Sequence, residues 1–369
     1  MLTDSSSTRI LVRAANWVGD AIMTTPVIRA VRKNYPKAYI TVLAKPWVVP
    51  VYENNPHVDE VMVYENNGRH KMGLGTLRLA GDIRQGGFDI AILMQNAFEA
   101  ALLAFLARIP QRLGYNTDGR SLLLNRCVRL DPVLKKKHLV DYYLGILKGA
   151  GLEDDGKILE LLLNDADRDY AKKILEDKGL KKAGKGSQYQ GNRDQGNKDQ
   201  GNRDPAGKMP VIGINPGATG GTAKRWFPDR YAGLCRKLSH QYQTKILIFG
   251  GPADNELGEE IMAMAPECCV NMAGKTSLSQ AFALIGNCDL FVTNDSGLMH
   301  AAAALNVNQV AVIGSTDYIA TAPLNHNSIM VREPVSCSPC LKDECPIDHR
   351  CMTRISVEKV MEVCRSVLG

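Results

Sequence analysis

The chain has 369 residues and a formal net charge of +6; 45% of its residues are hydrophobic and 23% are charged. These values are ordinary for a soluble globular protein of two or three domains, and they exclude a fibrous or wholly disordered chain. An acid, Asp4, stands where a secretory signal would carry cations, and no apolar run approaches the roughly 20 residues that span a bilayer. We therefore expect a cytoplasmic protein. Most of the small positive excess lies in residues 1–175, and it does not indicate nucleic-acid binding.

Short apolar runs rich in β-branched residues alternate with helical patterns along the chain. The first half predicts strands at residues 10–14, 39–44, 60–63 and 90–94, with helices at residues 21–33 and 98–108. The second half predicts strands at residues 211–215, 245–249, 269–272, 290–293 and 309–313, with helices at residues 228–240, 255–265, 277–287 and 297–305. This alternation predicts parallel sheets with right-handed crossovers, and hence two α/β domains. Ligands of such sheets bind beyond the carboxyl ends of the strands, so the loops there are the candidate sites.

A pentapeptide repeat separates the two halves. Residues 190–204 repeat Gln-Gly-Asn-Arg/Lys-Asp and contain no apolar side chain, so burial cannot offset the entropy cost of ordering them. We predict a flexible linker at residues 178–208 between an N-terminal domain (1–177) and a C-terminal domain (209–354), with a final helix at residues 355–369.

The loop after the first predicted strand places a carboxylate at the top of the first sheet. It contains Asn16, Trp17, Gly19 and Asp20 and runs directly into a helix. Asp20 could act as a general base toward a ligand. The alternative is that it caps the helix, because Asp is favoured at helix N-termini.

Residues 215–226 have the composition of a phosphate-binding loop. They combine glycines, hydroxyl groups and the cations Lys224 and Arg225 between a strand and a helix. Glycines allow close approach of the backbone to a phosphate, and the lysine supplies positive charge.

Residues 293–300 form the most distinctive segment. A predicted strand ends in Asp295-Ser296-Gly297, and a helix of small residues begins at once. The free amides of that helix suit a pyrophosphate. A single histidine on such a helix, His300, is more typical of a structural histidine than of a catalyst.

Two common signatures are incomplete or missing, and a third is present but is explained by helix structure. The Gly-Lys-Thr at residues 274–276 lacks the earlier glycine of a P-loop, and no Gly-x-Gly-x-x-Gly follows residues 10–14 or 211–215. The Asp-x-Asp within residues 165–169 opens an amphipathic helix, where acids favour the helix dipole.

Four of the ten cysteines are clustered near the C-terminus: Cys337, Cys340, Cys345 and Cys351. Their spacing is compatible with a structural Zn²⁺, with reduced packed thiols or with redox-active disulfides. Reduced thiols are the favoured interpretation, since a cytoplasmic protein is not expected to carry disulfides.

Together these loops resemble the ADP-heptose:lipopolysaccharide heptosyltransferases of glycosyltransferase family 9. The likeness extends over nearly the whole chain outside the repeat, and it rests on residues 16–20, 215–218, 293–300 and 314–317 in that order. The first of these, with the Thr-Thr-Pro at residues 24–26, is most similar to the heptosyltransferase II branch. The resemblance implies a GT-B fold: two Rossmann-like domains with parallel sheets facing an interdomain cleft.

The resemblance also implies a reaction. An inverting, metal-independent enzyme without a cofactor would transfer L-glycero-D-manno-heptose from ADP-heptose to the lipopolysaccharide inner core. The acceptor would be Kdo2-lipid A or heptosyl-Kdo2-lipid A, held mainly by the first domain. Asp20 would be the general base, and Lys224 would offset the charge on the departing ADP.

Further site residues follow from the same resemblance. Either Asp254 or Glu256 would accept hydrogen bonds from the ribose hydroxyls, and Gly220 stands where some relatives carry a hydroxyl residue. The implied nucleotide-sugar contacts are Thr219, Gly220, Lys224, Asp254, Glu256, Asp295, Ser296, Gly297, Leu298 and His300. The implied acceptor contacts are Asn16, Trp17, Gly19 and Arg120.

Three alternatives remain open from the sequence. The protein could act at the type I position or on another nucleotide heptose. It could be an NAD(P)-dependent oxidoreductase, although the missing glycine fingerprint opposes this, or a non-catalytic nucleotide-sugar binder. The basic residues between 112 and 137, including Lys135, Lys136 and Lys137, further predict peripheral contact with the anionic inner membrane.

Overall fold

The computed structural model describes residues 8–180 and 209–368, so the repeat at residues 190–204 lies outside the described residues. Contacts divide the chain into two compact units. One contains Met1–Asn164 and Asp317–Leu324, and the other contains Asp165–Thr316 and Asn325–Gly369. Within the described ranges, no helix combines the length and apolar character that a membrane crossing requires.

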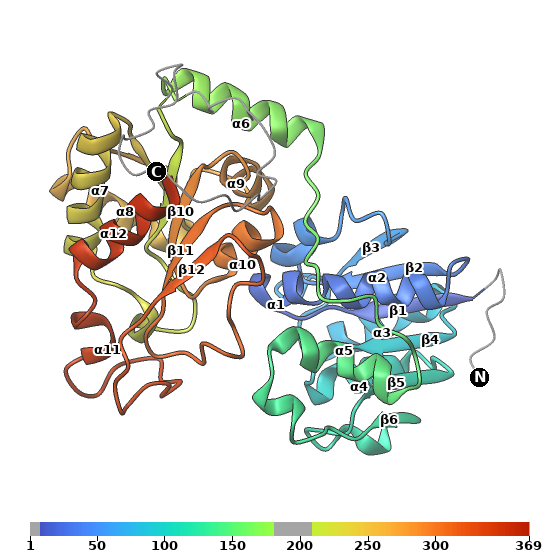
Figure 1. Cartoon of the computed structure of the whole chain (residues 1–369). Coiled ribbons are helices and arrows are strands. Elements are labelled where there is room, and N and C mark those ends of the chain that lie inside the picture. The colour runs from blue at the N-terminus through green and yellow to red at the C-terminus, as the bar shows by residue number, and fades with distance from the viewer. Residues whose placement is uncertain (1–7, 181–208, 369) are drawn as a thin grey trace, which may run out of the picture. The chain divides into compact units, whose positions relative to one another are not determined.

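The first unit is built on a six-stranded parallel sheet with the strand order β3-β2-β1-β4-β5-β6 (Figure 1). The strands are β1 (Arg9–Arg13), β2 (Tyr39–Ala44), β3 (Glu60–Val63), β4 (Ile90–Leu93), β5 (Gln111–Tyr115) and β6 (Arg126–Val128). The first four confirm the predicted strands. The sequence did not predict β5 and β6, because β5 begins with two polar residues and β6 has only three residues.

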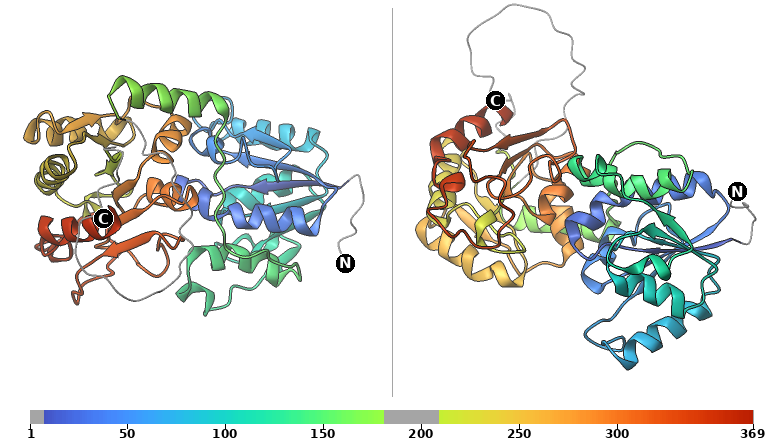
Figure 2. Two further views of the ribbon diagram at one scale, coloured as in Figure 1. Left: turned by 45° about the horizontal axis from the view of Figure 1, so that its top comes forward. Right: turned by 90° about the horizontal axis from the view of Figure 1, so that it is seen from below.

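The helices of this unit cover both faces of its sheet (Figure 2). They are α1 (Val18–Met23), α2 (Thr25–Asn34), α3 (Leu74–Gln85), α4 (Phe98–Leu106) and α5 (Leu139–Gly149), with short 3-10 turns η1 (Pro46–Val51), η2 (Arg120–Leu122) and η3 (Leu134–Lys136). The single helix predicted at residues 21–33 is in fact two helices. They divide at Thr24, whose hydroxyl donates to Ala21 O, and Pro26 fits the first turn of a new helix because it lacks an N–H.

The second unit has its own six-stranded parallel sheet, in the order β12-β11-β10-β7-β8-β9. Its strands are β7 (Ile212–Asn215), β8 (Ile246–Ile248), β9 (Cys269–Asn271), β10 (Leu290–Asn294), β11 (Gln309–Val312) and β12 (Ser328–Val331). The helices are α6 (Asp165–Asp177), α7 (Pro228–Tyr242), α8 (Asn255–Met264), α9 (Leu278–Ile285), α10 (Gly297–Ala304), α11 (Arg350–Thr353) and α12 (Val357–Leu368), with 3-10 turns η4 (Thr222–Lys224) and η5 (Pro252–Asp254). Alternate side chains of the buried strands pack with α7, α8 and α12 in one apolar core.

Two chain segments correct the predicted domain boundary at residue 177. Helix α6 belongs to the second unit, because it packs along α9 with Ala171 and Leu175 buried. Residues 317–324 return to the first unit. There Leu139 N donates to Ala320 O over 2.9 Å, and the His138 ring bonds Ala322 O over 2.8 Å.

Candidate active site

Asp20 lies in the first turn of α1, just beyond the carboxyl end of β1. Trp17, not Asp20, occupies the N-cap position, and the Trp17 side chain forms no capping hydrogen bond. The capping interpretation of Asp20 is therefore wrong. Its half-buried carboxylate instead accepts a hydrogen bond from the hydroxyl of Tyr143, on α5, with 2.7 Å between Tyr143 Oη and Asp20 Oδ1.

Tyr143 is a neutral donor in this contact. Burial, together with the adjacent Asp20 carboxylate, raises the pKa of Tyr143 well above 10. The phenol thus keeps its proton at physiological pH and holds the carboxylate in one orientation. The sequence did not identify Tyr143, because it lies in an apolar helical pattern that is typical of core residues.

The other predicted residues of the Asp20 loop lie at the same edge of the first sheet. The Trp17 side chain is 60% exposed, whereas Gly19 is buried within α1. Asn16 is fixed twice: its side chain accepts from Arg13 Nη2 over 2.9 Å, and its carbonyl accepts from Trp47 Nε1 over 2.7 Å. This loop therefore presents an indole and a carboxylate from a fixed backbone.

Arg120 was predicted to bind the acceptor, but its side chain is fully buried. Its guanidinium donates to Tyr115 O over 2.8 Å, to Gln95 O over 2.6 Å and to Asn96 Oδ1 over 2.5 Å. All three nitrogens are thus engaged within the protein. Arg120 fixes the loops after β4 and β5, and the structure does not present it to a ligand.

In the second unit, two asparagines join the loops that follow β7 and β10. Asn215 Nδ2 donates to Ser296 Oγ over 2.8 Å, and Asn294 Nδ2 donates to Pro216 O over 2.7 Å. Ser296 caps α10 by accepting from Met299 N. The predicted phosphate loop and the predicted pyrophosphate helix therefore lie side by side, and the amide of Gly297 begins the helix.

Lys224 ends η4, and glycines shape the chain before it. Gly220 and Gly221 have positive φ angles of 87° and 109°, which L-residues with a side chain rarely adopt. Lys224 Nζ lies 3.9 Å from the position of a Cβ on Gly220. The ammonium group thus lies over this glycine turn, where Thr219 is also exposed.

The structure distinguishes between the two candidate ribose-binding carboxylates, Asp254 and Glu256. The Asp254 carboxylate accepts from Gly251 N over 3.0 Å and pairs with Arg225 Nη2 at 3.6 Å. It packs so closely on Gly217 that a Cβ there would lie 2.5 Å away. Glu256 is exposed on α8, so Asp254 is the carboxylate that the fold brings to the phosphate loop.

The remaining predicted nucleotide-sugar residues differ in accessibility. Ser296, Gly297 and Leu298 are half-buried at the start of α10, whereas Asp295 is mostly buried just before it. His300 is buried within α10. Its position is that of a structural residue, in line with the expectation for a single histidine on that helix.

The four clustered cysteines surround one cavity of about 190 Å³ in the second unit. Burial, with the neighbouring thiols, raises the pKa of Cys351 to about 11. Across the described part of the chain, no three His, Cys, Asp or Glu side chains are arranged to hold a metal ion. The zinc interpretation therefore gains no support from the geometry.

The cysteine-rich loop instead supports the turn that carries Lys224. Ala223 N donates to Asp343 O, and His349 Nε2 donates to Ala223 O, each over 2.9 Å. A Cβ on Gly221 would lie only 2.1 Å from Asp343 O. His349 was not predicted as a site residue, since only the folded loop brings it to η4.

Comparison with known proteins identifies the family. Residues 76–350 match the model of glycosyltransferase family 9 (heptosyltransferase). Lipopolysaccharide heptosyltransferase 2 of Escherichia coli K12 is 32% identical, with 98% of each chain covered. The corresponding protein of Salmonella typhimurium is 31% identical, covering 98% of this chain and 99% of that protein.

Solved structures agree with this match. The structure of E. coli ADP-heptose lps heptosyltransferase II superposes with a TM-score of 0.77 at 29% identity, covering 98% of both chains. A family 9 glycosyltransferase from Veillonella parvula gives a TM-score of 0.82 at 25% identity, covering 98% of this chain and 97% of that one. The expected GT-B fold and the expected family are confirmed, and the oxidoreductase alternative is removed. This chain belongs to glycosyltransferase family 9, the heptosyltransferases.

Proposed function

We propose that this protein transfers L-glycero-D-manno-heptose from ADP-heptose to heptosyl-Kdo2-lipid A in the lipopolysaccharide inner core, with inversion and without a metal. Near full-length likeness to proteins named heptosyltransferase 2 supports the substrates. The observation that carries the chemistry is the Asp20 carboxylate, which Tyr143 holds beyond the end of β1.

On the acceptor side, Asp20 is the general base. It takes the proton of the acceptor hydroxyl while that oxygen forms a bond to the anomeric carbon of the heptose. The bond from that carbon to the β-phosphate oxygen breaks, and ADP leaves with the electron pair. Attack opposite the leaving group inverts the configuration.

On the donor side, the second unit stabilises the departing diphosphate. The first amides of α10 and the Lys224 ammonium offer positive charge where negative charge develops. Thr219 lies on the same turn as a hydroxyl donor, and Asp254 accepts from the ribose. These groups supply the stabilisation for which other glycosyltransferases use a metal ion.

A single assay tests this function. Purified protein is incubated with ADP-heptose and either Kdo2-lipid A or heptosyl-Kdo2-lipid A in the presence of a chelator, and products are read by mass. A gain of one heptose on the heptosylated acceptor alone supports the type II reaction. Transfer to Kdo2-lipid A alone would assign type I, and no transfer to either acceptor would contradict the proposal.

We also propose that the enzyme, in the cytoplasm, reaches its lipid-borne acceptor by peripheral contact through the first unit. Arg126 and Arg129 are exposed there, and the apolar side chains of Leu122 and Val133 are 94% and 56% exposed. Each cation near an anionic surface contributes about 1 kcal/mol within roughly a Debye length.

Co-sedimentation with vesicles containing anionic lipid tests this contact. Binding should weaken when the salt concentration rises to about 0.5 M, and when Arg126 and Arg129 are both replaced by Gln. Leu122→Ser reports separately on apolar insertion. Absence of pelleting at low salt would contradict membrane contact.

A further inference from the structure

A cavity of about 350 Å³ lies in the first unit, beyond the carboxyl ends of β4, β5 and β6. Its polar lining consists of Asn96, Thr117, Asp118, Lys135, Lys137 and Tyr142. Leucine side chains and Ala320, from the segment that returns to this unit, complete the wall. Small-molecule sites commonly occupy roughly 300–1,000 Å³, so the cavity has room for one sugar residue.

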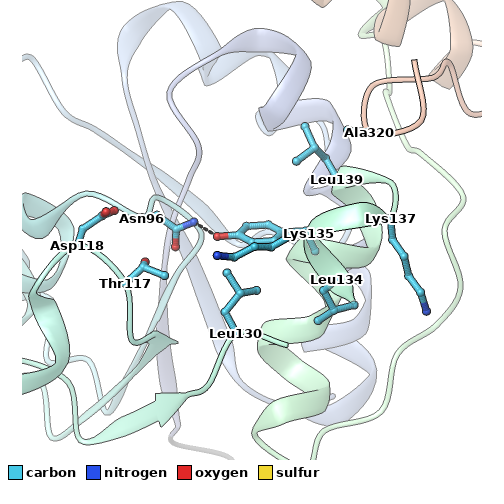
Figure 3. A pocket seen from close by; sticks show the side chains of 10 residues that line it. Asn96, Thr117, Asp118, Leu130, Leu134, Lys135, Lys137, Leu139 and Ala320 are labelled. Carbon is cyan, nitrogen blue, oxygen red and sulfur yellow. Dashed lines mark hydrogen bonds between the residues drawn. The ribbon is translucent and has the colours of Figure 1, made fainter. Parts of the chain in front are cut away.

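Hydrogen bonds connect the residues at the floor of this cavity. Buried Arg120 holds the Asn96 side-chain oxygen, and the Asn96 amide donates to the hydroxyl of Tyr142. The Tyr142 ring packs against Tyr115 with 4.8 Å between ring centroids. Figure 3 shows Asn96 lying between Asp118, Thr117 and the side chains of η3 and α5. Arg120 therefore contributes to this cavity from beneath, through Asn96.

The turn that carries Thr117 and Asp118 is left-handed. Asp118 and Gly119 both have positive φ angles, of 52° and 68°, a region that glycine and, among the other residues, aspartate and asparagine adopt most readily. Thr117 Oγ1 is shielded from solvent and forms no hydrogen bond with any other residue that the structure describes. A buried hydroxyl without a partner is costly, and a polar ligand in the cavity would relieve that cost.

The charges lie on opposite sides of the cavity. Asp118 projects from the β5 side, whereas Lys135 projects from η3 and its amine reaches toward Asn96 and Thr117 (Figure 3). Lys137 extends along the outer side (Figure 3). Neither Asp118 nor Lys135 has a salt-bridge partner among the pairs found in the described residues.

This set of groups fits one class of ligand. An ammonium pairs with a phosphate or carboxylate, and a carboxylate accepts hydrogen bonds from sugar hydroxyls. The Tyr142 ring and the leucines offer apolar surface for sugar C–H groups. We propose that this cavity is a subsite for one anionic sugar residue of the acceptor, which Lys135 recognises through its phosphate or carboxylate and Asp118 through its hydroxyls.

The position of the cavity relative to Asp20 gives the subsite its role. Tyr142 lines the cavity, and its neighbour Tyr143 holds Asp20, with 5.5 Å between the two ring centroids. The sugar in the cavity is therefore a neighbour of the residue whose hydroxyl reacts. It selects and orients the acceptor. This inference rests on the proposed heptosyl transfer.

A kinetic comparison with the deacylated acceptor tests the subsite without a membrane. Lys135→Gln should raise the acceptor KM by about ten- to a hundredfold, the value of a charge-assisted hydrogen bond, with kcat and the KM for ADP-heptose little changed. Lys136→Gln is the matched control, because Lys136 is equally exposed but does not line the cavity. An unchanged acceptor KM in Lys135→Gln would overturn the subsite.

Treating the acceptor with phosphatase shows whether Lys135 binds a phosphate or a sugar carboxylate. If Lys135 binds a phosphate, the treated acceptor has a raised KM that Lys135→Gln does not raise further. If it binds a sugar carboxylate, the effect of Lys135→Gln persists on the treated acceptor.

A direct binding measurement tests this subsite independently of the proposed heptosyl transfer. In calorimetry, glucose 6-phosphate should bind the wild type more tightly than glucose or inorganic phosphate does, and Lys135→Gln should remove that preference. Equal binding by wild type and variant, or no binding by either, would overturn the subsite even if heptosyl transfer is observed. If no heptosyl transfer is observed but the wild type still binds glucose 6-phosphate more tightly than glucose or inorganic phosphate, only the proposed function is contradicted.

Discussion

Tyr143 and Asp20 come from different helices of the first unit and meet through a 2.7 Å hydrogen bond from the phenol to Asp20 Oδ1. Tyr143 is almost fully buried, and its raised pKa keeps the hydroxyl a donor throughout the physiological range. This bond favours the ionised carboxylate and restricts its rotation. Tyr143 is thus a positioning residue for the proposed base.

Tyr143→Phe tests that relationship. The variant keeps the ring but removes the donor, so kcat should fall by roughly tenfold with little change in KM for ADP-heptose. Because the ionised carboxylate loses a hydrogen bond, the acid limb of the pH–rate profile should move to higher pH. A fall in kcat with an unmoved acid limb would assign Tyr143 a packing role only.

Asp20→Asn tests the base itself. The amide has nearly the same size but cannot take the proton, so kcat should fall about 10²–10⁴-fold. Binding of ADP, measured by calorimetry, should stay as in the wild type, because the residues proposed to bind ADP belong to the second unit and Asp20 belongs to the first. Near-normal turnover would remove Asp20 from the mechanism.

The sequence predicted the strands that are clear apolar runs, and it missed β5, β6 and β12. Strands such as β4 and β7 are buried along their whole length, and central strands of a parallel sheet are continuous apolar runs that a sequence shows directly. The edge strand β12 has two exposed residues at its centre, and its short apolar run, residues 329–331, is not enough to predict a strand.

The same distinction applies to the site. Glycines, hydroxyls and small residues at strand ends carry local signals, which is why residues 215–226 and 293–300 could be named as candidate binding loops from the sequence. The resemblance implied that Arg120 contacts the acceptor, and the sequence alone does not show the carbonyl groups that bury this charge. Tyr143 and His349 act through contacts with residues more than a hundred positions away, which no local pattern contains.

His138 predicts how the stability of the first unit depends on pH. Its Nδ1 accepts from Val140 N at the start of α5, so the proton lies on Nε2, which donates to Ala322 O. Burial lowers the pKa of His138 below its ordinary value of 6.5. The folded protein therefore takes up this proton less readily than the unfolded chain does.

The stabilisation from neutral His138 is complete above pH 6.5 and is lost as the pH falls through the lowered folded pKa. The melting temperature should therefore decrease as the pH falls below 6.5. His138→Asn, which can still cap α5 but cannot titrate, should show a smaller decrease over that range. Equal pH dependence of the two proteins would contradict this role for His138.

His349 gives the last prediction, which concerns the support of Lys224. The imidazole packs edge-on against Phe227 with 5.4 Å between ring centroids, and its Nε2 donates to Ala223 O, one residue before Lys224.

His349→Ala removes this bond and leaves η4 tied to the cysteine-rich loop by the bond from Ala223 N to Asp343 O. Lys224 then lies in a less rigid turn, so the KM for ADP-heptose should rise about fivefold, the value of one lost hydrogen bond. The acceptor KM should stay unchanged, because the residues proposed to bind the acceptor belong to the other unit. His349→Gln should restore most of the affinity, since its amide nitrogen can occupy the place of Nε2. If His349→Gln is as impaired as His349→Ala, or if both bind ADP-heptose like the wild type, the cysteine-rich loop does not position Lys224 through this histidine.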